Sequence, residues 1–553
     1  MWVRPVGPAA RPRTAGSRPD RPPALVRPPA VRPLLRCRPA VAGARLPSGA
    51  GPSRLGRPGR RDRPVGVRHR PLCLLRRIAR RILQRLHRHP GRPAAPRLAP
   101  RRGDGESGRH ARGPSRMNRW YGIRRLYEPP FRERVLLLLL IVIAAYYVTW
   151  SVVQWVTLTP AALRFDFVNY FSGAQAAAHG TDIYADFKQS WGTQAWVVAY
   201  IYPPFFAEVL APLTPLGLVG AARIWLLAVH GAFLGSLALL LRLHPELSRA
   251  GRRLFLLAAF GFMPVYLNLK FQQVATVWLL LVTAALWAAL RRRSGLAGAF
   301  IATAASLKVS PVFLIPLFAR LGRWRVAVFG SGALIAATAV TVLAAPGSWQ
   351  FFTVVLPRIG LGTANWDNGS IDGLVSRVVQ LAPNLFGGAT ETVAKVVIGA
   401  AAVTVIGVTL WCARPRGSDL SQAWTLRLGV AALISSVLIV SSVTWQHHLV
   451  TLLLPMATGA AWISVRRPGA RYAWWLFGAY AMCWLDRRAF PLPADLQLHS
   501  APQAALMLAG TSVKLFGMLL LWSLLLRMLR TEQAQASVRR LDPSSAGAGQ
   551  SAA

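Results

Sequence analysis

Residues 135–157 read VLLLLLIVIAAYYVTWSVVQWVT, a run that contains no charged side chain. A helix needs about 20 predominantly apolar residues to cross the ~30 Å hydrocarbon core of a bilayer, and this run is long enough to do so. The chain is 53% hydrophobic, contains 20 tryptophans and repeats runs of this kind along most of its length. The sequence therefore predicts an all-α protein that crosses the membrane many times.

Similar apolar runs continue as far as residue 526, where an arginine-rich segment follows. Run length and the basic or polar loops between the runs divide the sequence into candidate spans. The thirteen candidates are 135–157, 203–217, 221–241, 253–268, 273–290, 296–309, 311–321, 326–345, 391–412, 424–443, 446–464, 472–485 and 504–526.

Arginine clusters between the candidate spans predict the orientation, because such clusters stay on the cytoplasmic side. The clusters before residue 135 and after residue 526 are both expected there, which an odd number of crossings does not allow. We expect 203–217, PPFFAEVLAPLTPLG, to be interfacial or re-entrant, since it is short and contains four prolines. Twelve crossings remain, and 296–309 with 311–321 could equally form a re-entrant hairpin without changing this parity.

This orientation places four polar regions on the outer face: the loop 158–202, the turn at Gln272, the loop 346–390 and the turn 444–448. Exposure to water alone explains polar residues in any one of them. Together they combine Asp, Asn, Gln, His and Trp with few of the Lys or Glu residues that merely solvate a surface. The combination favours a chemical site on the extracytoplasmic face of the cell membrane.

The first 116 residues differ from the rest of the chain, because they are rich in Arg, Pro, Gly and Ala and contain no lysine. They cannot bury enough apolar surface to offset chain entropy, so we expect disorder. A mis-assigned start, with Met117 as the true one, is favoured over a targeting extension. We expect one transmembrane domain over 117–530, a disordered cytoplasmic tail over 531–553, and no nucleic-acid partner despite the net charge of +47.

The four cysteines give no sign of a metal site or a disulfide framework. Cys37, Cys73, Cys412 and Cys483 lack the CxxC or CxxH spacing of metal-binding motifs. We therefore expect no metal and no cofactor.

Five short stretches of the body carry distinctive patterns of polar and aromatic residues. They are FDFVNYFSGAQAAAHGTDIY at 165–184, YIYPPFFAEVLAPLTPLG at 200–217, SLKVSPVFLIPLFARLGRWR at 306–325, NGSIDGLVSR at 368–377 and SSVTWQHHLVTLLLP at 441–455. In order and in position relative to the spans, they resemble the polyprenol-phosphate-mannose-dependent alpha-mannosyltransferases, glycosyltransferase family 87 of the GT-C superfamily. One departure is FQQVAT at 271–276, where the resemblance leads us to expect a Gly-Gln pair; the Gln is kept and the Gly is not.

The resemblance implies a GT-C transmembrane bundle whose outer-face loops form the active site. It implies an inverting transfer of a mannosyl or other hexosyl residue from a polyprenyl-phosphate donor to a glycolipid or polysaccharide acceptor. No Gly-rich loop of the nucleotide-binding kind appears in the body, which suits a lipid-linked donor. Membrane lipids and these two substrates are the expected partners.

The resemblance assigns the general base to Asp166, and its position between two phenylalanines at the membrane surface favours a raised pKa. The alternative is that Asp166 caps a loop helix beginning near Val168. Asp182 and Asp186 flank a tyrosine in a turn-like segment, and turns recruit aspartate without any chemistry.

Cationic and imidazole side chains are the candidates that hold the donor phosphate. Lys308 lies in an otherwise apolar segment, where a charge is costly unless it is functional or extends to the surface. Arg377 either binds the phosphate or pairs with Asp372. His447 and His448 are adjacent, so on a helix they diverge by about 100° and only one is expected to face the site.

The remaining candidates are expected to contact sugar or acceptor. By resemblance they are Tyr202, Gln272, Asn368 and Trp445, although Trp also collects at membrane interfaces for amphipathic reasons. A transporter or flippase of a lipid-linked sugar is the alternative function. Such proteins place ionisable groups near the bilayer midplane and contain internal repeats, and neither feature is evident in this sequence.

Overall fold

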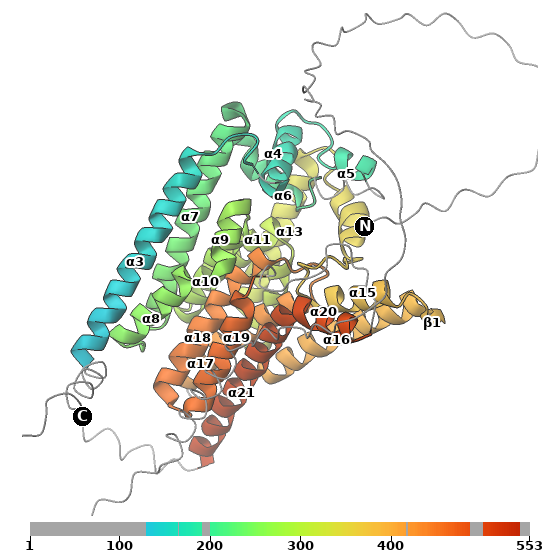
Figure 1. The fold of residues 1–553 in the computed structure, drawn as a ribbon. Helices are drawn as coiled ribbons and strands as arrows, with labels where there is room; N and C mark the ends of the chain where they lie inside the picture. Colours follow the sequence, from blue (N-terminus) through green and yellow to red (C-terminus); the bar gives the residue numbers. More distant parts are fainter. Residues whose placement is uncertain (1–128, 164, 191–198, 416–418, 487–500, 542–553) are drawn as a thin grey trace, which may run out of the picture. The chain divides into compact units, whose positions relative to one another are not determined.

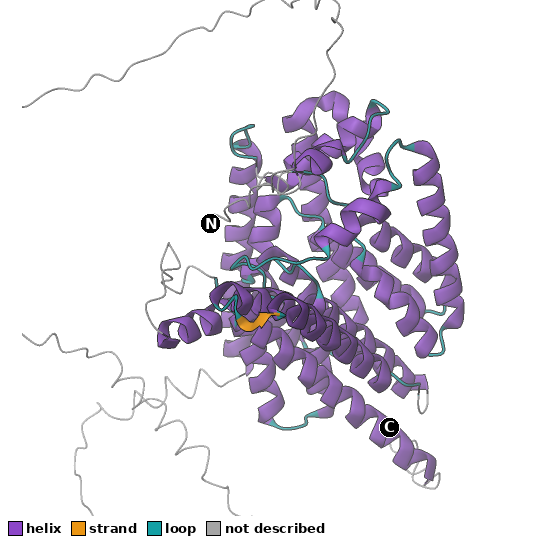
Figure 2. Cartoon of the chain, turned by 90° about the vertical axis from the view of Figure 1, so that its right-hand side faces the viewer, coloured by secondary structure: helices purple, strands orange, loops and turns teal. Residues whose placement is uncertain are grey.

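A computed structural model describes residues 129–163, 165–190, 199–415, 419–486 and 501–541. Within these ranges the fold is helical, and its one strand, β1 (Leu385–Gly388), has four residues (Figures 1 and 2). The prediction of an all-α architecture is confirmed. The extension 1–116 and residues 542–553 lie outside the described residues.

Every predicted span is matched by one helix or by a pair of consecutive helices. In the first half these helices are α3 (Pro129–Val156), α7 (Gly217–Leu243), α8 (Arg249–Phe260), α9 (Met263–Phe271), α10 (Ala275–Leu290), α11 (Ser294–Leu307), α12 (Leu314–Arg320) and α13 (Trp324–Ala344). In the second half they are α16 (Thr390–Cys412), α17 (Asp419–Val440), α18 (Leu453–Arg466), α19 (Ala470–Trp484), α20 (Ala501–Thr511) and α21 (Val513–Leu541).

The connecting regions are also largely helical, which the sequence did not predict in detail. These shorter elements are α4 (Phe165–Ala178), α5 (Ala185–Ser190), α6 (Pro204–Leu210), η2 (Ala211–Leu216), η3 (Ser310–Phe313), η4 (Phe351–Val355), α14 (Leu356–Ile359), α15 (Ile371–Leu381) and η5 (Gln446–Leu452). Most of the predicted site residues lie in these short elements or at their ends.

Fewer helices are of full membrane-spanning length than the twelve crossings predicted. Six described helices are long and apolar enough, or eight if the bent pairs α8–α9 and α20–α21 each count as one. The two pairs are bent by 46° and 54°. Helices α10 and α11 have 16 and 14 residues, fewer than the roughly 20 that a straight crossing needs.

The proline-rich segment 203–217 forms no separate long helix. It folds into α6 and η2, which lead directly into α7, and α6 packs against α4. Prolines occupy the first turns of both short elements, where their missing N–H groups leave no hydrogen bond unmade.

The predicted tail begins too early. Helix α21 continues through 531–541, and Glu532 within it is 1% exposed. Its carboxylate accepts two hydrogen bonds from the Arg466 guanidinium, at 2.6 and 2.8 Å, and one from Trp462 Nε1 at 2.7 Å. This buried and paired carboxylate ties the end of α21 to α18, so the helix extends beyond the apolar part of its sequence.

Close helix packing fixes the short helix α11, which ends at the site. A Cβ atom added to Gly298 in α11 would lie 2.6 Å from the backbone nitrogen of Gly330 in α13. Only a residue without a side chain permits this approach of two backbones. The position of the end of α11 is therefore set by its contact with α13.

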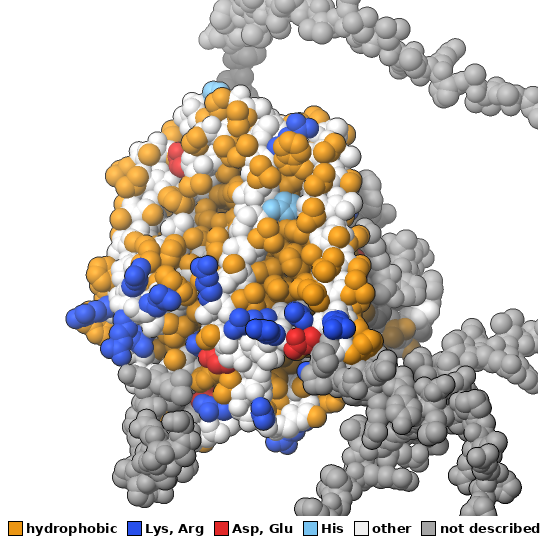
Figure 3. All heavy atoms as spheres, turned by 90° about the vertical axis from the view of Figure 1, so that its left-hand side faces the viewer, with side chains coloured by type: hydrophobic (Ala, Val, Ile, Leu, Met, Phe, Trp, Pro, Cys, Tyr) orange, Lys and Arg blue, Asp and Glu red, His pale blue; other side chains and the backbone are white. Residues whose placement is uncertain are grey.

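The arginine clusters and the predicted site lie at opposite helix ends. The clusters fall between α7 and α8, α10 and α11, α12 and α13, α16 and α17, and α18 and α19. The other ends of these helices lead to the loops that carry the candidate site residues. On the face in Figure 3, Lys and Arg side chains gather toward one end, and hydrophobic side chains cover much of the remainder.

Candidate active site

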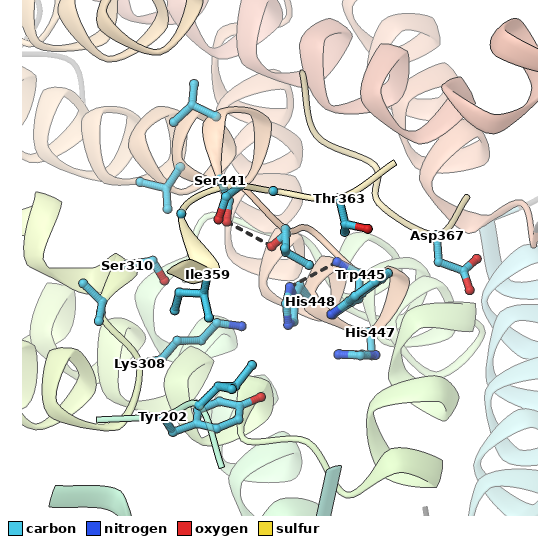
Figure 4. Close-up of a pocket in the computed structure, with 18 of the residues that line it drawn as sticks. Tyr202, Lys308, Ser310, Ile359, Thr363, Asp367, Ser441, Trp445, His447 and His448 are labelled. Carbon is cyan, nitrogen blue, oxygen red and sulfur yellow. Dashed lines mark hydrogen bonds between the residues drawn. The ribbon is translucent and has the colours of Figure 1, made fainter. Parts of the chain in front are cut away.

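One cavity of about 1020 Å³ brings six of the predicted site residues together. These are Asp166, Tyr202, Lys308, Trp445, His447 and His448. They come from the first turn of α4, the segment before α6, the end of α11 and the start of η5. In Figure 4, the labelled Lys308, Tyr202, Trp445 and both histidines surround the same space.

The lining of this cavity changes from polar to apolar. Besides the residues above, the polar part includes Lys270, Arg358, Asp367 and Asp486, which the sequence did not single out. The apolar part includes Phe313, Val403, Ile406, Val437 and Val440. Because Val403 on α16 lines the cavity and is 75% exposed, the apolar wall reaches the outer surface of the helix bundle.

Asp166 lies in the first turn of α4 and is partly exposed to the cavity. The capping alternative placed a helix start near Val168, whereas α4 begins at Phe165 and includes Asp166. Burial raises the pKa of Asp166 to about 6, and this rise is opposed by a hydrogen bond from Gln273 and by the charge of Lys308. A carboxyl group in this range is suited to accept a proton near neutral pH.

A glutamine that the sequence did not single out, Gln273, makes a hydrogen bond with Asp166, whereas Gln272 was the residue expected to contact sugar or acceptor. Gln272 is 2% exposed, lies outside the cavity lining and ends α9 in the left-handed conformation, with φ of 54°. A left-handed position favours glycine. The backbone at Gln272 would therefore suit the glycine of the expected Gly-Gln pair, with Gln273 as its glutamine.

Lys308 follows the last residue of α11 in an extended conformation, so its side chain leaves the helix and lines the cavity. Figure 4 shows its ammonium directed into the space beside the histidines. It interacts electrostatically with Asp166, His447 and His448. The structure thus places one cation at the centre of the polar part.

Both histidines line the cavity, contrary to the expectation that only one would face it. They lie in the first turn of the 3-10 helix η5, and Figure 4 shows both rings beside the space that the Lys308 side chain enters. The backbone N–H of Trp445 donates to His448 Nδ1 at 3.2 Å, so a neutral His448 carries its proton on Nε2. The Nε2 atom of His447 is buried and has no hydrogen-bond partner among the described residues.

Arg377 and Asn368 do not line the cavity, and both support the loop beside it. Arg377 donates to the carbonyl oxygens of Asn365 and Asn368, each at 3.0 Å, and to Ser512 Oγ at 3.3 Å. The Asn368 amide donates to the carbonyls of Thr363 and Ser442, at 3.0 and 2.9 Å. This loop is thereby joined to the segment that precedes η5.

Other predicted residues have structural contacts. Asp182 pairs with Lys188 at 2.5 Å and accepts from the backbone N–H of Tyr184 at 3.0 Å. Tyr184 in turn donates its hydroxyl to the carbonyl of Tyr202 at 2.7 Å. This turn consequently holds the segment that carries the cavity-lining Tyr202.

Comparison with known proteins shows which protein family the region around this cavity resembles. Residues 200–442 match the model of glycosyltransferase family 87. This stretch of the chain is similar to glycosyltransferase family 87. The match contains Tyr202, Gln273 and Lys308, while Asp166 and the histidine pair lie on either side of it.

The curated relatives that match this chain are named as mannosyltransferases. One from Mycobacterium tuberculosis is named polyprenol-phosphate-mannose-dependent alpha-(1-2)-phosphatidylinositol pentamannoside mannosyltransferase. It is 28% identical over 64% of this chain and 78% of the relative. A protein of the same name from Mycolicibacterium smegmatis is 27% identical over 54% of this chain and 70% of the relative. A third relative, also from Mycolicibacterium smegmatis, is named polyprenol-phosphate-mannose-dependent alpha-(1-2)-phosphatidylinositol mannoside mannosyltransferase. It is 28% identical over 57% of this chain and 73% of the relative.

Ionisable side chains, including carboxylates and histidines, line the cavity. Among the residues that the structure describes, no group of three or more His, Cys, Asp or Glu side chains is arranged to hold a metal ion. The described cysteines, Cys412 and Cys483, are buried and unpaired with each other. Independence from metal remains a prediction.

Proposed function

We propose that this protein transfers a mannosyl residue from a polyprenyl-phosphate donor to a hydroxyl group of a glycolipid acceptor. The observation that carries the proposal is the single cavity in which Asp166, Lys308 and the pair His447 and His448 meet. Glycosyl transfer from a lipid phosphate needs a base for the incoming hydroxyl and positive or hydrogen-bonding groups for the departing phosphate. The cavity offers both kinds of group.

The apolar wall supports a lipid-linked donor. A polyprenyl chain requires an apolar surface that is continuous with the membrane interior, whereas a soluble sugar nucleotide does not. Val403 and Ile406 of α16, together with Val437 of α17, provide such a wall between the polar part and the bundle surface. The donor and acceptor named for the relatives, polyprenol phosphate mannose and a phosphatidylinositol mannoside, are both lipids.

In the proposed reaction, an acceptor hydroxyl oxygen attacks the anomeric carbon as the bond from that carbon to the phosphate oxygen breaks. The hydroxyl proton passes to the Asp166 carboxylate, and the bonding electron pair leaves with the phosphate. Lys308 and the Nε2–H of His448 stabilise the charge that develops on the phosphate. Attack from the face opposite the leaving group inverts the configuration at the anomeric carbon.

We place the reaction at the extracytoplasmic face of the plasma membrane. The support is the alternation described above, in which the arginine clusters and the cavity lie at opposite ends of the same helices. Arginine clusters of short loops stay in the cytoplasm. The same alternation supports the proposal of a GT-C bundle, in which the short helices α10 and α11 also contribute to the crossings.

The donor proposal is tested with membranes that contain the full chain. Radiolabelled polyprenyl-phosphate-mannose is supplied with phosphatidylinositol mannosides, and labelled glycolipid products are separated by chromatography. We expect transfer from the lipid donor and none from GDP-mannose when synthesis of the lipid donor is blocked. Efficient transfer from GDP-mannose under that block would refute the proposal, as would a lack of transfer from polyprenyl-phosphate-mannose to any mannoside acceptor.

The orientation is tested with single cysteines in a variant without the native ones. Gln175 and Leu361, both exposed near the cavity end, are each replaced by Cys, and Gly295 is replaced at the arginine end. A Cβ atom at Gly295 meets nothing within 4 Å, so this position accepts the side chain. An impermeant thiol reagent applied to intact cells should label the first two and not the third, and the reverse pattern would overturn the assigned face.

A further inference from the structure

Gln273 is a buried amide that lies behind Asp166, outside the cavity lining, and is 1% exposed. Its Oε1 accepts a hydrogen bond from the Tyr170 hydroxyl at 2.8 Å and another from the Tyr202 hydroxyl at 3.3 Å. A carbonyl oxygen has two lone pairs, so these two hydroxyl groups occupy its acceptor capacity. The amide nitrogen must therefore point away from both tyrosines, and its side chain makes a hydrogen bond with Asp166.

The orientation of this amide is fixed by the packing around it. Tyr170 is fully buried in α4, and its ring meets that of Tyr202 edge to face, with centroids 4.8 Å apart. The backbone of Gln273 is held as well, because its N–H donates to the carbonyl of Asn268 at 2.9 Å. The left-handed residue Gln272 provides the turn that brings Gln273 to this place.

Four groups face the Asp166 carboxyl, of which one lies on α4 itself and the other three come from separate segments of the chain. They are Gln273, Tyr202, the Lys308 ammonium and Tyr170. The hydroxyl groups of Tyr170 and Tyr202 are both engaged with Gln273. Lys308 contributes charge from the cavity side, whereas Gln273 contributes a directed N–H from the protein interior.

We infer that Gln273 is a positioning residue for the transfer: clamped by Tyr170 and Tyr202, it holds one oxygen of the Asp166 carboxylate and leaves the other for the acceptor's proton. The inference rests on the proposed function, because it takes Asp166 as the base. Gln273 gains and loses no proton in the reaction. Its effect is to fix the direction of the carboxylate and to favour the ionised form that accepts the proton.

A glutamate at position 273 reverses this effect while keeping the size of the side chain. It can still accept from both tyrosines, but it presents a carboxylate oxygen to Asp166 in place of an N–H. Two carboxyl groups that share one site do not readily ionise together, so one of them titrates at higher pH. The pH at which Asp166 becomes active is therefore expected to rise.

The test is the pH dependence of kcat/KM in purified full-length protein. Gln273→Glu should move the acidic limb, expected near pH 6 in the unaltered protein, upward by about one pH unit or more. Tyr170→Phe removes one clamping hydroxyl from a residue that does not line the cavity, and it should move the limb in the same direction by less. Gln272→Gly, a change at the neighbouring glutamine, is the matched control and should leave the limb in place.

A purely structural Gln273 would lower the yield of folded protein without moving the limb. An unchanged limb in folded Gln273→Glu and Tyr170→Phe would therefore overturn the inference. If Gln273→Glu does not fold, Tyr170→Phe decides alone, because it retains the packed ring and lacks only the hydroxyl. A limb that moves equally in Gln272→Gly would also count against a specific role for Gln273.

A second readout separates this inference from the proposed function. The infrared absorption of the protonated Asp166 carboxyl, assigned by its loss in Asp166→Asn, is followed against pH without substrate. Its titration should move upward in Gln273→Glu whatever the donor proves to be. If the titration of Asp166 shifts in Gln273→Glu but Asp166→Asn keeps full activity, then Asp166 is not the base and Gln273 has no positioning role in the transfer. An unshifted titration with an inactive Asp166→Asn would refute Gln273 alone.

Discussion

Two basic residues of this protein have similar sequence settings and opposite structural environments. Lys308 and Arg377 each lie beside a loop expected at the outer face, and each is a plausible phosphate ligand by sequence. Lys308 leaves the end of α11 and enters the cavity. Arg377 points away from it and donates to two backbone carbonyls and Ser512.

The difference follows from what each cation has around it. Lys308 has an ammonium on a flexible stem, extends from the end of α11 into the cavity and is attracted by Asp166. The planar guanidinium of Arg377 offers five N–H donors, which suits several carbonyl oxygens of an irregular loop at once. A cation near a site thus serves substrate or scaffold according to the acceptors that the local backbone presents.

The largest expected effect concerns the group that Lys308 faces. Asp166→Asn keeps the shape of the side chain and removes its basicity, so transfer should fall at least about a hundredfold while the amount of folded protein stays normal. The measurement is the rate of mannosyl transfer by equal amounts of purified protein. Asp186→Asn, the same change outside the cavity, is the control, and near-normal turnover of Asp166→Asn would remove it from the reaction.

The pH profile belongs to the same prediction. A base acts when deprotonated, and burial raises the pKa of Asp166 to about 6. Activity should therefore be level above this pH and decline as the pH falls below it, by about tenfold per unit once the carboxyl is protonated. A profile that stays level well below pH 6 would contradict the role of Asp166 as the base.

Arg377→Met should mainly affect stability. The change leaves the buried carbonyl of Asn368 and the part-buried carbonyl of Asn365 without their donor, at a cost of about 2–3 kcal/mol in the free energy of unfolding. Thermal unfolding in detergent measures this loss. The molecules that remain folded should retain their KM for the donor, and a raised KM with unchanged stability would return Arg377 to the phosphate site.

Lys308→Met is the change that matches Arg377→Met, made at the cation that enters the cavity. It removes a charge-assisted contact to the phosphate, so transfer should slow by about ten- to thirtyfold. Thermal unfolding should change little, because Lys308 makes no contact that supports a loop of the kind Arg377 holds. If Lys308→Met instead lowers stability and leaves turnover intact, the two cations have been assigned the wrong way round.

Gln272→Gly tests whether Gln272 differs in role from its neighbour Gln273. The φ of Gln272, 54°, is unfavourable for a residue with a Cβ atom, and its buried Oε1 has no hydrogen-bond partner among the described residues. Glycine should therefore stabilise the protein by about 1 kcal/mol, read as a higher unfolding temperature. A clear destabilisation would show that the packing of the side chain outweighs the backbone strain.

The smallest expected effect is that of metal removal. If Lys308 and His448 supply the stabilisation of the phosphate, dialysis against EDTA should leave the rate unchanged. The assay compares treated protein with the same preparation after addition of Mg²⁺ or Mn²⁺. Loss of activity on chelation and recovery with a divalent ion would show that a metal contributes to the reaction.

The sequence was sufficient to predict the helical class and the approximate position of each span, because long apolar runs have few other structures available to them. The span orientation and the family resemblance also predicted that Asp166, Lys308 and the histidine pair would lie at one face, and all four line the same cavity. The sequence did not distinguish Gln272 from Gln273. That choice depends on a left-handed turn, whose usual signal, a glycine, is absent from this chain.

The sequence also did not separate Arg377 and Asn368 from the cavity. Both lie in a polar loop with the composition of a binding site, and their role is decided by long-range contacts, such as those with Ser442 and Ser512. The end of α21 was missed for a similar reason. Its charged sequence is typical of a tail, and only the pairing of Glu532 with Arg466 shows that it is packed.

The short helix α11 sets the depth of the site within the membrane. At a rise of about 1.5 Å per residue, its 14 residues cover roughly 21 Å of a hydrocarbon layer about 30 Å thick. In the orientation that we propose, the arginine end of α11 lies at the cytoplasmic surface, and Lys308 would then lie several ångströms short of the opposite surface. A donor phosphate would have to descend below the level of the surrounding headgroups to reach it, or the bilayer would have to be thinner around the protein. Bilayer thickness is consequently a physical variable that this enzyme should sense through its smallest helix.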